Sequence, residues 1–188
     1  QGWAVFPLVP NTKRPLPPNG FKDASKSVYA VRKWWTQHPA ANIGLATGEM
    51  SGIAVIDVDV KNGAKGRESL SSLNGLPPTL TVTTPSGGWH LYYLCPQGGL
   101  RSRNGALPGI DLKADGGYVV APPSTIEGKP YTLDEDAPLA PLPDWLMQIK
   151  PSKSSAAFKL ALNAQGQVPR GQQDEELHKL ACSLARQG

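Results

Sequence analysis

Residues 52–60 read GIAVIDVDV, an apolar run that carries two carboxylates, Asp57 and Asp59, close to its end. A continuous apolar run of this length is typical of a buried strand. Side chains two residues apart in a strand point to the same face, so the two acids share one face and Val58 lies on the other. Burying two unpaired like charges side by side is costly. The end of this strand is therefore either open to solvent or occupied by a cation.

The rest of the chain predicts an α+β (mixed α/β) fold, because a few helices are combined with many strands in mixed order. Further strands are expected at residues 3–9, 42–48, 79–84, 89–95, 109–113 and 117–121. Helices are expected at residues 27–39, 65–73, 143–149 and 174–188. Residues 96–108 are expected to form a loop.

The helix at residues 27–39 is predicted by its apolar spacing. Ser27 is a suitable N-cap, and Pro39 ends the helix because proline disfavours a helical conformation in the residue before it. The apolar stripe is expected to face the core, and its members are Val28, Val31, Trp34 and Trp35.

Composition places the chain among ordinary globular domains. It has 188 residues, 39% hydrophobic content and a formal net charge of +4, which is compatible with a polyanionic partner but does not demonstrate one. No apolar run approaches the roughly 20 residues of a membrane helix. Cys95 and Cys182 match no metal-binding spacing, and we expect two reduced core thiols in a cytoplasmic protein.

A third acid, Asp111, lies inside the apolar strand at residues 109–113. Lys113 shares its face, so a simple salt bridge between the two is one interpretation. We favour a third metal ligand, because this strand has the same shape as the strand of Asp57. Asp115, in contrast, belongs to an Asp-Gly sequence that is typical of a turn.

A histidine follows a glycine-rich turn in the sequence TPSGGWHLYYL. His90 alternates with its neighbours, so it faces the same side as Tyr92. A histidine beside aromatic side chains is often a satisfied core residue. Backbone amides at Gly87 and Gly88 beside an imidazole would, alternatively, form an anion-binding corner.

Cationic side chains are frequent in the expected loops: Lys13, Arg14, Lys65, Arg67, Arg101 and Arg103. Each taken alone is an ordinary surface charge. Three acids, one histidine and several loop cations are nevertheless the groups that nucleotidyl transfer requires. In that chemistry two metal ions bind the attacking and leaving oxygens, and cations hold the phosphates.

Six sequence blocks resemble the bifunctional DNA primase/polymerase (prim-pol) domain of the archaeo-eukaryotic primase superfamily, over roughly residues 2–147. One Asp-x-Asp pair is a weak motif, whereas six blocks in the same order and with similar spacing are specific. The blocks are VFPLVPNTKRPL, GFKDAS, WWTQHPAANIGLATG, GIAVIDVDV, LTVTTPSGGWHLYY and GIDLKADGGYVVAPPS.

The resemblance implies roles for the matching positions. Asp57 and Asp59 correspond to the paired metal-binding acids and Asp111 to the third acid, with two Mg²⁺ or Mn²⁺ ions as cofactors. His90 corresponds to the histidine that contacts the nucleotide triphosphate. Further nucleotide contacts are expected from Ser86, Gly88, Lys113, Lys13 and Arg103. Gly88 stands where the wider superfamily often has serine.

The resemblance also implies an architecture. The expected fold is an α/β module beside a sheet of RNA-recognition-motif type, with the active site in the cleft between them. Residues 1–149 would form the catalytic domain, residues 150–171 a basic linker that helps to hold the template, and residues 172–188 the start of a truncated C-terminal helical module.

The implied activity is that of a DNA primase and DNA polymerase from a phage-, plasmid- or mobile-element-type replication protein. Its partners would be a single-stranded DNA template and primer, deoxynucleotides or ribonucleotides, and a downstream helicase domain, with no membrane. Two alternatives stay open. One is a non-catalytic module of a replication initiator or defence protein that binds single-stranded DNA or nucleotide. The other is an Asp-x-Asp glycosyltransferase, which would share only the metal chemistry.

Overall fold

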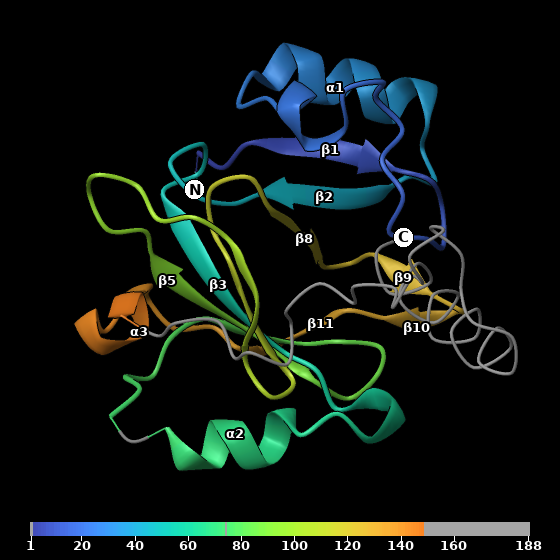
Figure 1. Ribbon diagram of the computed structural model, residues 1–188. Coiled ribbons are helices and arrows are strands. Elements are labelled where there is room, and N and C mark those ends of the chain that lie inside the picture. The colour runs from blue at the N-terminus through green and yellow to red at the C-terminus, as the bar shows by residue number, and fades with distance from the viewer. Residues whose placement is uncertain (1, 74, 149–188) are drawn as a thin grey trace, which may run out of the picture. The chain divides into compact units, whose positions relative to one another are not determined.

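The strand β3 (Ile53–Val58) lies at the centre of a seven-stranded sheet (Figure 1). In this computed structural model the described residues are 2–73 and 75–148, all within the first of its two units, residues 1–152. All residues of β3 except Asp57 are buried, as the apolar sequence predicts. The predicted linker and final helix lie outside the described residues.

The central sheet has the order β11-β4-β5-β3-β7-β6, and β12 pairs with β5 as well. Its neighbours along this order are antiparallel, and only the β12–β5 pair is parallel. The strands besides β3 are β4 (Thr81–Thr83), β5 (Trp89–Leu94), β6 (Arg103–Leu107), β7 (Ile110–Lys113), β11 (Thr132–Glu135) and β12 (Ala140–Pro141).

A second, antiparallel sheet has the order β1-β2-β8, formed by Val5–Leu8, Asn42–Ala46 and Tyr118–Ala121. β1 is an edge strand of this sheet, which explains how it tolerates Pro7. A small hairpin pairs β9 (Thr125–Ile126) with β10 (Lys129–Pro130).

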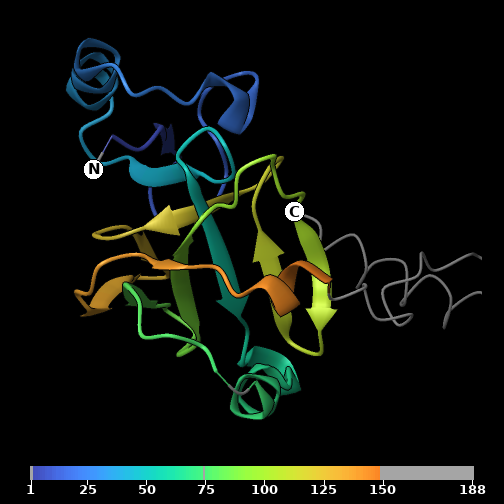
Figure 2. The ribbon, with the colours of Figure 1, turned by 90° about the vertical axis from the view of Figure 1, so that its left-hand side faces the viewer.

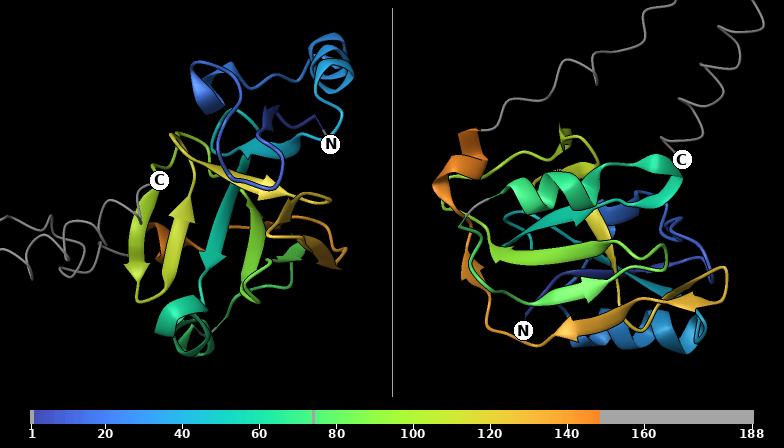
Figure 3. Two further views of the ribbon diagram at one scale, coloured as in Figure 1. Left: turned by 90° about the vertical axis from the view of Figure 1, so that its right-hand side faces the viewer. Right: turned by 90° about the horizontal axis from the view of Figure 1, so that it is seen from below.

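The helices α1 (Val28–Gln37) and α2 (Gly66–Ser72) lie on opposite sides of this unit (Figure 2). Figure 3 shows α2 against the central sheet in the view from below. A short helix, α3 (Asp144–Gln148), follows β12, and two 3-10 turns, η1 (Gly20–Asp23) and η2 (Lys61–Gly63), complete the helical elements. The longest described helix has ten residues, so no helix in this part of the chain can cross a membrane.

Two hydrophobic cores lie on the two faces of β3. Alternate residues of β3 enter different cores, because successive side chains of a strand point to opposite faces. Ile53 and Val55 pack between the two sheets with Phe6, Leu45 and Tyr92. On the other face, the core with α2 and α3 contains Ala54, Ile56, Val58, Tyr93, Leu112 and Leu146.

The predicted mixed α/β fold is confirmed, but three local expectations were wrong. Of the predicted apolar stripe of α1, Val28 is 65% exposed, Val31, Trp34 and Trp35 are half-buried, and none belongs to either hydrophobic core. Residues 103–107 form β6 rather than a loop, because the open edge of β7 pairs with them. Cys95 is half-buried rather than a core residue.

Gly44 is required where β1 and β2 pair. It lies directly opposite Phe6, and a Cβ atom at this position would collide with the Phe6 ring. We expect Gly44→Ala to lower the free energy of unfolding by about 1–3 kcal/mol, the usual cost of overpacking. Urea denaturation measures this change.

The matched control is the double variant Phe6→Leu/Gly44→Ala, in which a smaller side chain leaves room for the new methyl group. The loss of unfolding free energy in the double variant should be smaller than the sum of the losses in the two single variants, because both substitutions act on one contact. Additive costs would contradict the packing explanation.

Candidate active site

Asp57 lies in one cross-strand row with His90 on β5 and Asp111 on β7. Residues directly opposite each other in antiparallel strands share a face, so the three side chains project to the same side. Two residues earlier, Val55 and Tyr92 occupy the equivalent row and enter the core between the sheets. The row of Asp57 therefore faces the side on which the three-stranded sheet packs.

His90 holds Asp57 from one side. The imidazole is buried, and its Nε2 lies 3.5 Å from Oδ1 of Asp57. Burial raises the pKa of Asp57, but the hydrogen bond and charge interaction with His90, followed by the charges of Lys113 and Lys13, more than offset this effect. The pKa of Asp57 therefore lies below its usual value, and its carboxylate is ionised at neutral pH.

Asp111 forms the salt bridge that the sequence left as one interpretation. Its Oδ2 accepts a hydrogen bond of 2.8 Å from Nζ of Lys113, and its Oδ1 accepts one of 2.7 Å from the amide of Gly105. Nζ of Lys113 also donates to Oδ1 of Asn104 at 2.9 Å. Lys113 therefore lies beside the row of Asp57, His90 and Asp111 (the acid row). Its ammonium group, predicted to contact the nucleotide, contacts the carboxylate of Asp111 in this structure.

Asp59 follows the last residue of β3. Its amide donates to the carbonyl of Gly109 at 2.8 Å, and its carbonyl accepts from the amide of Gly66 at 3.1 Å. A Cβ atom at Gly66 or Gly109 would collide with the backbone of the other or of Asp59. Glycine at these two positions therefore allows two loops to hold the backbone of Asp59.

Tyr131 is a site residue that the sequence analysis missed. Burial raises its pKa, and the charges of Asp57 and Asp59 raise it further. Its ring is 5.6 Å from that of His90, centre to centre. Residue 131 lies in a polar segment without strand periodicity, and its one sequence signal is an isolated aromatic residue.

The anion-binding corner predicted at the glycine-rich turn is not formed. The amide of Gly87 donates to the carbonyl of Thr84, and the amide of Gly88 donates to Oγ1 of Thr84. A Cβ atom at Gly88 would collide with the carbonyl oxygen of Val58, so this glycine lets the turn pack against the end of β3. Ser86 is exposed, and its hydroxyl lies 3.1 Å from that of Thr84.

Only some of the predicted cations lie near the acids. Lys13 does, because its charge contributes to the low pKa of Asp57. Arg103, in contrast, pairs with Leu112 on the opposite face of the sheet, and its Nη1 donates to the carbonyl of Met147. The β6–β7 pairing decides this orientation, and the sequence suggested no strand there.

Arg101, Asp115 and Arg67 make contacts away from the row of Asp57, His90 and Asp111. The backbone of Arg101 forms an isolated β-bridge with the backbone of Asp115, beyond the end of β7 that is farther from Asp59. Asp115 has a structural role, because its carboxylate accepts hydrogen bonds from the amides of Glu49 and Leu100. The guanidinium of Arg67 lies 4.6 Å from the centre of the Trp89 ring, a cation–π contact.

The carboxylates have the oxygen chemistry that hard divalent cations prefer. In the part of the chain that the structure describes, no three acidic, histidine or cysteine side chains form a ready-made metal centre. Asp57 and Asp59 each contact a neighbour through Oδ1 only, so Oδ2 of each has no described partner. Both oxygens of Asp111 are engaged, so metal binding there requires Lys113 to move.

The low pKa of Asp57 makes a prediction about stability. An ionised group whose pKa is lower in the folded state stabilises above its unfolded pKa of about 4, and this contribution is lost as the pH falls through the folded pKa. We expect Asp57→Asn to remove this contribution, so unfolding free energy should change less between pH 7 and pH 3. Urea denaturation in the presence of a metal chelator measures the free energy of unfolding at each pH.

The control is Asp136→Asn, because Asp136 is exposed. Identical pH profiles of the unfolding free energy for Asp57→Asn and wild type would contradict the prediction.

Comparison with known families agrees with this arrangement of residues. The sequence pattern of the Prim-Pol family, described as "Bifunctional DNA primase/polymerase, N-terminal", matches residues 1–145. No curated protein sequence matches the chain. The family match covers most of the 188 residues and includes the whole row of Asp57, His90 and Asp111. The chain belongs to the bifunctional DNA primase/polymerase family, whose members are enzymes of the nucleotidyltransferase type.

Proposed function

We propose that this chain carries out template-directed nucleotidyl transfer as a primase and polymerase. The observation that carries the proposal is the single row of Asp57, His90 and Asp111 at the end of a buried strand, with Asp59 directly after it. In the reaction a primer 3′-hydroxyl attacks the α-phosphate of the nucleotide, a new phosphodiester bond forms, and pyrophosphate leaves.

Two Mg²⁺ or Mn²⁺ ions are the proposed cofactors, with Asp57, Asp59 and Asp111 as ligands. The ions would supply charge neutralisation at the attacking and leaving oxygens. The chain itself prepares the ligands: His90, Lys113 and Lys13 keep Asp57 ionised despite burial. Lys113, once it leaves Asp111, would be available to pair with a phosphate of the nucleotide.

His90 has two proposed roles. Its Nε2 faces Asp57 and orients that carboxylate. Its Nδ1 is buried without a hydrogen-bond partner among the described residues, which is costly unless a ligand or water supplies one. A rearrangement on nucleotide binding would allow the imidazole to contact the triphosphate, as the family resemblance implies.

The two sheets are the proposed counterparts of the two modules of a primase-like fold. In support, the acid row faces the side of the three-stranded sheet, and Lys13, from the loop after β1, affects the charge state of Asp57. The proposed partners are a single-stranded DNA template, a primer and nucleotides. A downstream helicase domain and an origin in a phage, plasmid or mobile element belong to the same proposal.

Asp59→Ala is the first test of this proposal. We expect it to abolish incorporation of labelled nucleotides on primed single-stranded DNA with Mn²⁺ or Mg²⁺. Without metal its unfolding free energy should stay constant or rise, because one of two neighbouring like charges is removed.

The control is Asp136→Ala, which removes an exposed acid of β11's C-terminal flank and should leave incorporation unchanged. A wild-type chain that binds DNA but incorporates no nucleotide would instead support a binding module. A large loss of stability in metal-free Asp59→Ala would show a structural role for this acid.

His90→Ala should weaken nucleotide use more than DNA binding. Loss of a hydrogen bond to a charged group costs about 1.5–3 kcal/mol, so kcat/KM for the nucleotide should fall on the order of ten- to a hundredfold. Steady-state incorporation and DNA-binding anisotropy measure the two effects, and His90→Gln should recover part of the activity. Equal losses in both measurements would contradict the assignment.

A further inference from the structure

We propose that α1 and the pocket at its C-terminal end bind single-stranded nucleic acid, and that this surface guides the template toward the acids. The inference rests on the proposed function for the identity of the strand as template. It begins with two exposed side chains in the first turn of α1: Val28 is 65% and Tyr29 80% exposed. They are adjacent, and they are two of the five large hydrophobic side chains that are exposed among the described residues.

The charge of the chain is concentrated around this helix. Residues 2–48 contain six Lys or Arg and a single acid, Asp23, a formal net charge of +5 against +4 for the whole chain. All six cations are exposed, and within the described residues none forms a salt bridge. Asp23 accepts hydrogen bonds from the amide and side chain of Asn19. The six are Lys13, Arg14, Lys22, Lys26, Arg32 and Lys33.

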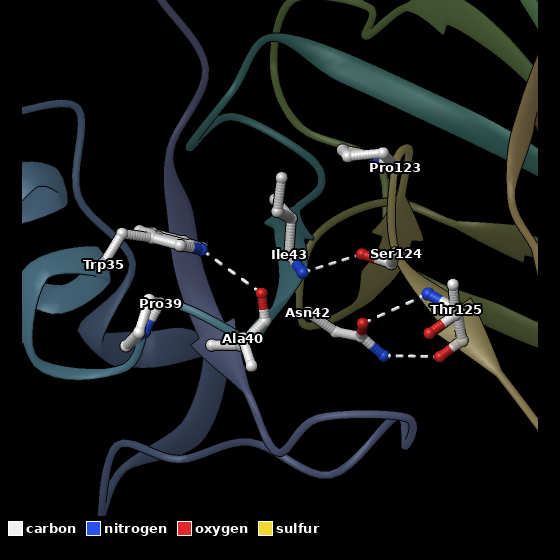
Figure 4. A pocket seen from close by; sticks show the side chains of 9 residues that line it. Trp35, Pro39, Ala40, Asn42, Ile43, Pro123, Ser124 and Thr125 are labelled. Carbon is white, nitrogen blue, oxygen red and sulfur yellow. Dashed lines mark hydrogen bonds between the residues drawn. The ribbon is translucent and has the colours of Figure 1, made fainter. Parts of the chain in front are cut away.

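The pocket beside α1 offers apolar surface for a flat ring. Its volume is about 330 Å³, and Trp35 and Pro39 line one side while Pro123 lies on the other (Figure 4). Arg32 lies one turn before Trp35, on the same side of the helix. A base stacked on the indole would therefore have a cation near its phosphate, which is how proteins hold single strands.

The polar groups of the pocket are already satisfied. Nε1 of Trp35 donates to the carbonyl of Ala41 at 3.2 Å, and the amide of Ile43 donates to Oγ of Ser124 at 2.8 Å. Nδ2 of Asn42 donates to the carbonyl of Thr125 at 2.7 Å. The pocket therefore favours stacking over hydrogen-bond recognition of one base, and we expect binding with little sequence preference.

A series of contacts links this pocket to the acids. Nδ2 of Asn42 also donates to the carbonyl of Thr12, at 2.9 Å. The next residue is Lys13, whose carbonyl accepts a hydrogen bond from the Tyr118 hydroxyl, and Tyr118 packs against the core that contains Tyr131 beside His90. A strand held at Trp35 would therefore pass the loop of Lys13 on its way to the acid row.

Fluorescence anisotropy with the full chain and a labelled oligothymidylate of about 20 nucleotides tests the proposal. A metal chelator and the absence of nucleotide keep this measurement independent of catalysis. Arg32→Gln/Lys33→Gln should raise Kd on the order of tenfold or more and reduce the salt slope by about 0.7 for each phosphate that is no longer neutralised. Tyr29→Ala should also raise Kd, and because this side chain is exposed its removal should not unfold the protein.

Trp35→Leu tests the pocket and should raise Kd with a nearly unchanged salt slope, since it removes stacking but no charge. The matched control, Arg101→Gln, removes one positive charge outside α1 and should retain wild-type Kd. Circular dichroism verifies folding of each variant. Unchanged Kd and salt slope in both Arg32→Gln/Lys33→Gln and Tyr29→Ala would overturn the inference and leave this surface to a protein partner.

Primed incorporation at saturating DNA separates this inference from the proposed function. If wild type incorporates nucleotides and the α1 variants bind DNA as tightly as wild type, the inference fails and the function stands. If wild type incorporates no nucleotide while the α1 variants lose DNA binding, the binding surface is supported and the proposed function is contradicted. If the inference about α1 and the proposed function are both correct, the α1 variants should regain nucleotide incorporation as the DNA concentration is raised.

Discussion

The arrangement of this protein depends on one ionised carboxylate at the end of a buried strand. Asp57 lies where β3 passes between β5 and β7, and burial there opposes its charge. His90 and Lys113 more than offset that effect, so the carboxylate stays ionised in a partly buried position. The neighbouring strands must then keep their register, because a slip of one residue would turn His90 and Asp111 to the other face.

The backbone around Asp59 is held by close packing that only glycine allows. Gly66 and Gly109 pack against each other and the Asp59 carbonyl, and Gly88 packs against the Val58 carbonyl. Three separate segments therefore converge on Val58, the last residue of β3, and on Asp59, which follows it. Their glycines serve this approach rather than anion binding, since the Gly88 amide is already used within its own turn. This packing positions the acids before any ligand arrives, which favours tight geometry at a catalytic site.

Charge and chemistry are divided along the chain. Asp57 and Asp111 lie on the central sheet, whereas the excess positive charge lies in residues 2–48, which include α1 and two strands of the three-stranded sheet. Lys13 lies where the two meet, because its loop is tied to the second sheet by Asn42 and Tyr118 and its charge acts on Asp57. Under the proposed function, a polyanionic substrate would be attracted to the first region and would react at the second.

The sequence alone predicted the family, the mixed fold and the position of Asp57 near the end of a buried strand, because apolar runs and strand alternation are local properties. The pairing of β3 with β7, which brings Asp111 opposite Asp57, belongs to the tertiary structure. Tertiary structure decided what depends on distant partners. Arg103 turned away from the site because the open edge of β7 paired with a segment without strand signals. Tyr131 entered the site from a polar stretch, and Val28 of the predicted apolar stripe of α1 stayed exposed while the rest of that stripe is half-buried. Local periodicity shows which face a side chain takes, whereas only the fold decides what covers that face.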